Sequence, residues 1–224
     1  MDSQEQRKIL HEGRFLRLVK HGHWEYAERS SAQGAVVIVA ITDNRRLLFT
    51  EQHRVPMGKA VIELPAGLVG DIPGEENEAW AEAARRELLE ETGYAARGIR
   101  FLAHGPVSAG FGTETVSFFL AKGIRRVHRG GGVDGEDIRV HEVPLDRADG
   151  WLRKQVRNGL LVDPKVYAGL YFSERVARRP PSGGGDRAQR APRSSRAVGS
   201  LRSTTATRAA RKPRSQIRNR RGRR

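Results

Sequence analysis

The chain has 224 residues, of which 38% are hydrophobic and none is cysteine, and its formal net charge is +15. Because it lacks cysteine, a scaffold held by disulfides is excluded, and we expect a protein of the reducing cytoplasm. No apolar run approaches the roughly 20 residues needed to cross a bilayer. Residues 1–5 also lack the basic-then-apolar pattern of a secretory signal.

The first third of the chain is predicted to be β-structure. Residues 14–20 and 24–28 flank a Gly-containing turn and are expected to form a hairpin. The apolar, β-branched run 35–41 is typical of a central strand, and further strands are predicted at 46–51 and 60–64.

A helix is predicted to begin near Asn77 or Glu78 and to end at Thr92. Asn77 is a good N-cap, and Gly93 suits a left-handed C-cap. Four residues recur at helical spacing and form an apolar stripe expected to face a core: Trp80, Ala83, Ala84 and Leu88.

The acidic residues of this helix lie off the apolar stripe. Glu87 and Glu91 are four residues apart, so their Cβ atoms are about 5–6 Å apart on one face, and Glu90 flanks them. Arg86 is four residues before Glu90 and can bridge to it. A bare pattern of this kind is more often a solvated acidic face with one ion pair. Concentrated carboxylates also favour a hard divalent cation, which takes oxygen ligands.

Strands are predicted to follow this helix at 100–103, 115–121 and 138–143, and helices at 147–158 and 164–172. Strands on both sides of a central helix indicate an α/β fold with a mixed sheet between helices.

The positive charge is confined to the end of the chain. Residues 174–224 contain 17 Arg and Lys against two acids, so residues 1–173 are neutral. Such a segment cannot bury enough apolar surface to offset its ordering entropy, so we expect disorder. The tail is interpreted as an RNA- or DNA-binding arm, an inert extension or the product of a reading-frame change. We favour a tail without function, because no aromatic follows Phe172 to stack on bases.

The run 63–68 (Glu-Leu-Pro-Ala-Gly-Leu), Glu78 and the run 86–94 (Arg-Glu-Leu-Leu-Glu-Glu-Thr-Gly-Tyr) together closely resemble the Nudix box. That pattern is a Gly, five residues, a Glu, seven residues, then Arg-Glu-apolar-x-Glu-Glu-x-Gly-apolar, and the second half matches throughout. Ten residues, rather than five, separate Gly67 from Glu78. Residues 70–74 are therefore interpreted as a loop insertion; alternatively, Glu78 is not the equivalent of the first Glu.

The resemblance implies an α/β/α sandwich with a mixed central sheet, preceded by an N-terminal β-hairpin region. Its domains would be residues 1–34 for dimerisation, 35–173 for hydrolysis and 174–224 as the tail, and a homodimer is expected. It also implies Mg²⁺ or Mn²⁺ bridging the helix carboxylates and a substrate pyrophosphate. The implied metal ligands are Glu87, Glu91, the Ala66 carbonyl and Glu90, unless Glu90 is instead held by Arg86.

The run Gln52-His53-Arg54 with the Pro-Ala-Gly lead-in looks like the ADP-ribose pyrophosphatase branch of the family, in which such an Arg contacts phosphate. Residues 105–114 resemble a loop of that branch, although Ala109 stands where Pro is usual. Arg54, Glu63 and Glu114 are therefore expected to contact substrate, and Glu114 is also a candidate to approach the metals as a general base. An acidic loop before the strand at 138–143 carries the candidate general bases, with Glu136 as first choice and Asp134 as second.

The resemblance therefore predicts hydrolysis of ADP-ribose or a related nucleotide sugar to a nucleoside monophosphate and a sugar phosphate. One alternative is a decapping or dinucleoside-polyphosphate hydrolase. Another is a polyanion-binding protein acting through the basic tail. The residues do not select the base or the sugar of the substrate.

Overall fold

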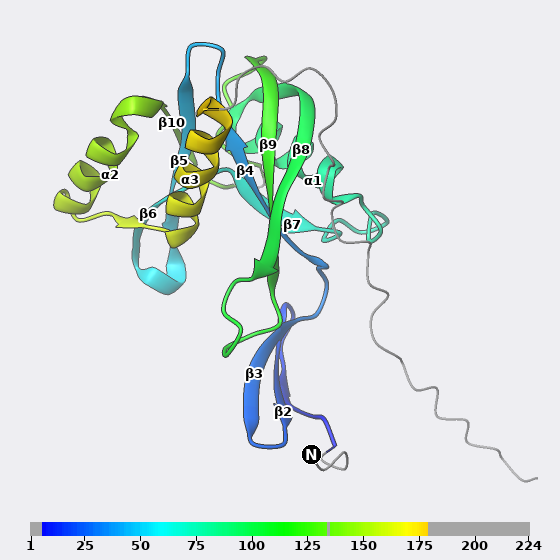
Figure 1. Ribbon diagram of the computed structural model, residues 1–224. Coiled ribbons are helices and arrows are strands. Elements are labelled where there is room, and N and C mark those ends of the chain that lie inside the picture. The colour runs from blue at the N-terminus through cyan, green and yellow to red at the C-terminus, as the bar shows by residue number, and fades with distance from the viewer. Residues whose placement is uncertain (1–5, 134, 179–224) are drawn as a thin grey trace, which may run out of the picture. The chain divides into compact units, whose positions relative to one another are not determined.

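The computed structural model describes residues 6–133 and 135–178 (Figure 1). The candidate base Asp134 lies outside these residues. The predicted tail was expected to be disordered from residue 174, but residues 174–178 are helical, and the rest of the tail, from residue 179, lies outside the described residues. Of the helices described, none combines the length and apolar character that a bilayer crossing requires.

Within the described residues the elements follow one another along the chain in this order: β1 (Lys8–Glu12), β2 (Leu16–His21), β3 (Trp24–Arg29), β4 (Gly34–Ala40), β5 (Arg46–Arg54), η1 (Val55–Met57), β6 (Lys59–Glu63), β7 (Ala66–Val69), α1 (Trp80–Thr92), β8 (Tyr94–Pro106), β9 (Thr115–Arg126), β10 (Arg139–Pro144), η2 (Leu145–Arg147), α2 (Ala148–Arg157), β11 (Leu161–Val162) and α3 (Pro164–Arg178).

The main body is built on two four-stranded sheets, ordered β7-β4-β9-β8 and β10-β5-β6-β11. Each contains one parallel pair, β4 with β9 and β6 with β11, among antiparallel neighbours. The predicted mixed α/β architecture is therefore confirmed, with the mixed sheet divided into two. The N-terminal strands form a separate antiparallel sheet ordered β1-β2-β3.

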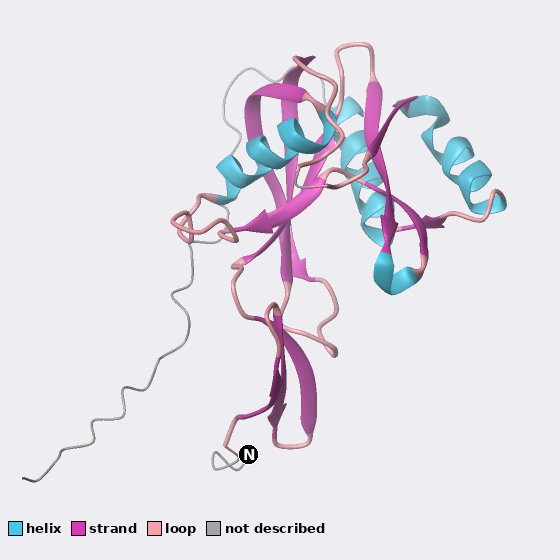
Figure 2. Cartoon of the chain, turned by 180° about the vertical axis from the view of Figure 1, so that it is seen from behind, coloured by secondary structure: helices cyan, strands magenta, loops and turns pink. Residues whose placement is uncertain are grey.

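Strand β4 separates the two hydrophobic cores, because successive side chains of a strand point to opposite faces. Val36 and Ile38 pack with Leu88 of α1 in one core. Val37 and Val39 pack with Val166 of α3 in the other. Figures 1 and 2 accordingly show α1 and α3 on opposite faces of these strands. The four residues of the predicted apolar stripe of α1 are all buried.

The N-terminal hairpin is confirmed, with His21 paired to Trp24 across the turn. Strand β1, which was not predicted, extends this hairpin into a three-stranded sheet. The predicted start of α1 is wrong: the helix begins at Trp80, and its N-cap, Ala79, makes no side-chain cap. The reason is tertiary, because the Glu78 side chain is taken by Arg86 and its N–H closes a turn on the Glu75 carbonyl.

Several strands differ in length from the prediction. β8 and β9 have 13 and 12 residues, because they pair from Tyr94–Arg126 to Pro106–Thr115 in one long antiparallel ladder. Charged residues and glycines, such as Arg97 and Gly98 in β8 and Lys122 and Gly123 in β9, interrupt the apolar pattern at these ends. The short strands β7 and β11 were not predicted, and α3 continues to Arg178.

Candidate active site

Arg86 is the centre of an ion-pair network on α1. Its Nε and Nη2 donate to the two oxygens of Glu78, each at 3.1 Å. Its Nη1 donates to Glu87 at 2.8 Å and to Glu90 at 3.2 Å, and Nη2 also donates to the Leu68 carbonyl at 3.1 Å. Burial acts to lower the pKa of Arg86, but hydrogen bonds and charges from Glu78 and Glu87 raise it above its usual value. The predicted Arg86–Glu90 bridge is therefore present, within a larger set.

Glu87 lies directly against the backbone of β7. A Cβ atom on Gly67 would be only 1.9 Å from the Glu87 carboxyl carbon, so only glycine leaves room for this side chain. Burial raises the pKa of Glu87 to about 7; Arg86 acts to lower it, whereas the charges of Glu90 and Asp71 raise it further. The role of Gly67 was not predicted, although its place in the Pro-Ala-Gly lead-in was a signal.

Glu91 is the most buried of the three carboxylates, with 6% of its surface exposed. One oxygen accepts a hydrogen bond from the Ala66 N–H at 3.1 Å. Burial raises the pKa of Glu91 well above its usual value; the Ala66 N–H acts to lower it, and the nearby charge of Glu87 raises it. A buried carboxylate with one neutral donor is costly when ionised, unless a cation lies beside it.

Arg54 joins the site from the end of β5. Its Nε donates to Glu63 of β6 at 2.8 Å. The two residues predicted to contact substrate are therefore hydrogen-bonded to each other. Burial acts to lower the pKa of Arg54, but Glu63, Glu91 and Glu136 raise it above its usual value. These electrostatic effects place Arg54 near both the buried carboxylate of α1 and the acidic loop.

The loop that carries Glu136 is attached to the C-terminal end of α1. The Gly131 N–H donates to the Glu91 carbonyl at 2.8 Å, and the Gly132 N–H donates to the Glu90 carbonyl at 3.1 Å. The charge of Glu136 acts on Glu91. The structure therefore brings the first candidate base to the helix carboxylates.

Glu114 is placed elsewhere. It forms an ion pair with Arg29 of β3 and lines a cavity of about 270 Å³ between the N-terminal sheet and the β8–β9 loop. The same loop bridges to this sheet through Gly112 and Ala27. The residues that line this cavity come from β2, β3 and the β8–β9 loop rather than from α1.

The donors present fit a hard divalent cation. Over residues 6–133 and 135–178, no three His, Asp or Glu side chains already converge on one metal position. The three carboxylates of α1 point to other partners instead: Glu87 and Glu90 pair with Arg86, and Glu91 accepts the hydrogen bond of the Ala66 N–H. Glu87 and Glu91 supply oxygen atoms of the kind that Mg²⁺ and Mn²⁺ bind, and a bound cation would offset the cost of burying their charges.

Comparison with known proteins identifies relatives of this chain. Residues 32–159, more than half of the chain, match the family described as NUDIX domain. The chain is 32% identical over 123 residues to the methanol dehydrogenase activator of Bacillus methanolicus, covering 54% of this chain and 64% of that protein. It is 35% identical over 116 residues to the ADP-ribose pyrophosphatase of Bacillus subtilis strain 168, covering 51% and 60%.

A third relative is the GDP-mannose pyrophosphatase of Enterobacter sp. strain 638, with 32% identity over 148 residues, 62% of this chain and 72% of that protein. The chain thus spans 60% to 64% of the first two relatives. A crystal structure described as an ADP compounds hydrolase superposes with a TM-score of 0.57 at 20% identity, covering 77% of this chain and 91% of that one. That structural similarity supports the assignment of the fold.

Proposed function

Because this chain belongs to the NUDIX domain family, we propose that it is a divalent-metal-dependent pyrophosphohydrolase acting on ADP-ribose or a related nucleotide sugar. Its products would be a nucleoside monophosphate and a sugar phosphate. The observation that carries this proposal is the pair of buried carboxylates, Glu87 and Glu91, beside Arg54 and the Glu136 loop. Two of the relatives above are named as pyrophosphatases of ADP-ribose and of GDP-mannose.

Each residue has a chemical task in this proposal. Glu87 and Glu91 would hold Mg²⁺ or Mn²⁺, together with the Ala66 carbonyl, and Arg86 keeps Glu87 and Glu90 in place. A cation bound there supplies charge neutralisation for the pyrophosphate and lowers the pKa of the attacking water.

The substrate and the water are handled by residues outside α1. Arg54 presents a guanidinium fork suited to a phosphate oxygen, and Glu63 holds that fork in position. Glu136 accepts the proton of the water that attacks phosphorus. Glu114, which is paired with Arg29, contacts the part of the substrate away from the pyrophosphate.

The test is a substrate panel on the full chain with Mg²⁺ or Mn²⁺, with release of nucleoside monophosphate as the readout. The panel contains two sugar nucleotides, ADP-ribose and GDP-mannose, which test the proposed activity. It also contains a dinucleoside polyphosphate and a capped RNA, which test the two alternative hydrolase activities. Glu91→Gln should lower kcat at least about 100-fold, because it removes a charged metal ligand. Glu82→Gln, on the same helix but exposed, is the matched control. Absence of product from every sugar nucleotide would exclude the proposal.

We also infer that two copies of the chain associate through the N-terminal sheet and the adjoining β8–β9 loop. Phe15, Trp24 and Phe111, which belong to this region, have 59%, 54% and 71% of their surfaces exposed. Exposed large apolar side chains concentrated in one part of a protein mark an interaction surface. Replacing Phe15 and Trp24 by Glu should give monomers in size-exclusion chromatography with light scattering. Val55→Glu, at an exposed apolar residue of η1, should leave the oligomeric state unchanged. A monomeric unmodified chain would contradict this inference.

A further inference from the structure

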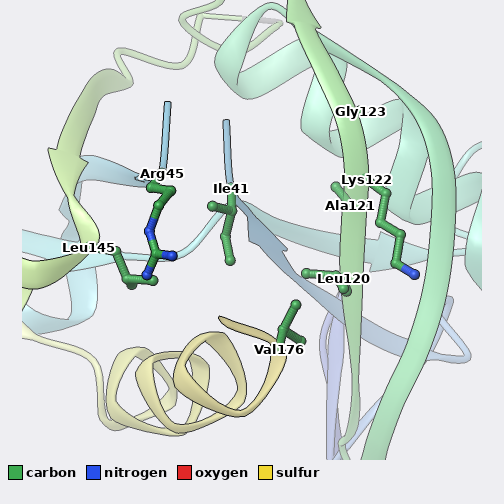
Figure 3. A pocket seen from close by; sticks show the side chains of 8 residues that line it. All are labelled: Ile41, Arg45, Leu120, Ala121, Lys122, Gly123, Leu145 and Val176. Carbon is green, nitrogen blue, oxygen red and sulfur yellow. The ribbon is translucent and has the colours of Figure 1, made fainter. Parts of the chain in front are cut away.

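A second pocket lies away from the carboxylates of α1. It has a volume of about 300 Å³ and is lined by eight residues from β9, η2, α3 and the β4–β5 connection. Figure 3 shows the side chains of four of them pointing toward a common centre: Ile41, Leu120, Leu145 and Val176. The guanidinium of Arg45 extends toward the same space, whereas Lys122 runs to the other side of β9.

This pocket is separated from the candidate active site by a sheet. Ile41, Leu145 and Val176 pack with the core on the α3 side of β4. Leu88 of α1 belongs to the core on the opposite side. A ligand in the pocket therefore does not contact the carboxylates of α1.

The backbone of Arg45 is in an uncommon conformation. Its φ angle is 55°, and in the described part of the chain it is the one residue other than glycine with a positive φ. Its N–H donates to the Thr42 carbonyl at 2.9 Å, and its carbonyl accepts from the Leu145 N–H at 3.0 Å. Such a conformation costs about 1–2 kcal/mol for a residue with a Cβ, and glycine or asparagine adopts it more readily. An outlier of this kind is a reason to look for a function of the side chain.

The Arg45 guanidinium is available to a ligand. Among residues 6–133 and 135–178 it has no hydrogen-bond or ion-pair partner, whereas its neighbour Arg46 is held by Glu142. None of the eight lining residues is acidic, and the two ionisable ones, Arg45 and Lys122, are both basic. Apolar walls with an unpaired guanidinium at the edge match an amphipathic anion.

We propose that this pocket binds a compact amphipathic carboxylate, separately from the pyrophosphate site. The apolar body of the ligand lies among Ile41, Leu120, Leu145 and Val176. Its carboxylate accepts paired hydrogen bonds from the guanidinium of Arg45.

The test is calorimetric titration of the full chain with octanoate, with 1-octanol as the uncharged probe. Octanoate should bind at least about tenfold more tightly than octanol, the difference expected for a charge-assisted hydrogen bond. Arg45→Asn should weaken octanoate binding to the same degree without lowering the Tm, because asparagine tolerates a positive φ. Arg157→Asn, at an exposed residue of α2, should bind like the unmodified chain.

A second variant tests the apolar part of the pocket. Val176→Trp fills the space among the apolar side chains and leaves Arg45 in place, so octanoate should no longer bind. The proposal is overturned if octanoate does not bind at millimolar concentration. It is also overturned if octanol binds equally well, or if either variant binds octanoate like the unmodified chain while remaining folded.

Discussion

Gly67→Ala is the most direct test of the candidate active site. The added Cβ would be 1.9 Å from the carboxyl carbon of Glu87 and 2.0 Å and 2.3 Å from its two oxygens. Carbon atoms in contact are about 3.5–4.0 Å apart, so the carboxylate must move by at least about 1.5 Å. Gly67 does not have a positive φ, so alanine adds no backbone strain there. The perturbation is therefore confined to the position of one side chain.

A displacement of this size is large for a reacting site. A misplacement of about 1 Å can cost about 100-fold in rate, so kcat/KM for the best sugar nucleotide should fall by at least about 100-fold. The Arg86–Glu87 hydrogen bond of 2.8 Å is also lost. Because the clash is with the end of a flexible side chain and not with backbone, the free energy of unfolding in urea titration should fall by only about 1 kcal/mol, the low end of the cost of overpacking.

Gly105→Ala is the matched control for this change. Gly105 lies in β8, does not have a positive φ, and a Cβ there would meet nothing within 4 Å. It should keep the activity and stability of the unmodified chain. If Gly67→Ala retains full activity, Glu87 does not need its present position, and its assignment as a metal ligand is wrong.

Three further predictions concern the same site. Without metal, the free energy of unfolding should fall as the pH rises from about 4.5 to about 7. This is because the folded state raises the pKa of Glu87 from 4.5 to about 7 and so holds its proton more tightly than the unfolded chain does. The Glu87 carboxyl accounts for at most about 3 kcal/mol of this fall in the free energy of unfolding, and added Mg²⁺ should oppose it. If the Tm measured in chelator does not change with pH, burial does not raise the pKa of Glu87. Arg86→Gln should lower the free energy of unfolding by about 3–5 kcal/mol in urea titration, because it leaves the carboxylates around Arg86 without their cation. A change below about 1 kcal/mol would show that these carboxylates do not need Arg86 for stability. Gly130→Ala should lower kcat, because its Cβ would be 2.4 Å from the Thr92 carbonyl carbon and would lift the Glu136 loop off α1. Gly135→Ala, which has a similar φ but open space around the added Cβ, should leave kcat unchanged. Equal kcat values for the two variants would show that contact between this loop and α1 does not matter for catalysis.

The features that could be predicted from the sequence are those that depend on the local spacing of apolar residues. The stripe of α1, represented by Trp80 and Leu88, is buried as expected, because apolar residues at three- and four-residue spacing form one face of a helix. The start of the helix was wrong because Asn77 satisfies the local rule for a cap, while Arg86 binds Glu78 across eight residues. Local rules cannot include that ion pair.

Long-range pairing explains the other differences. Strand β7 begins with Ala66 and Gly67, which are weak strand formers, and it exists because it pairs with β4. Glu114 was expected by resemblance to contact substrate, and in the structure it pairs with Arg29, which lies 85 residues earlier in the chain. Nothing in the residues near Glu114 signals that partner.

The five extra residues between Gly67 and Glu78 can now be given a structural interpretation. Gly67 seats Glu87, and Glu78 binds Arg86 through both oxygens, so both ends of the lead-in meet the same turn of α1. Arg86 also takes the Leu68 carbonyl, which holds the near end of the insertion. Residues 70–74 are looped out between these points and form no helix or strand. Contact with Arg86, rather than spacing along the chain, therefore favours Glu78 as the equivalent of the first Glu of the motif.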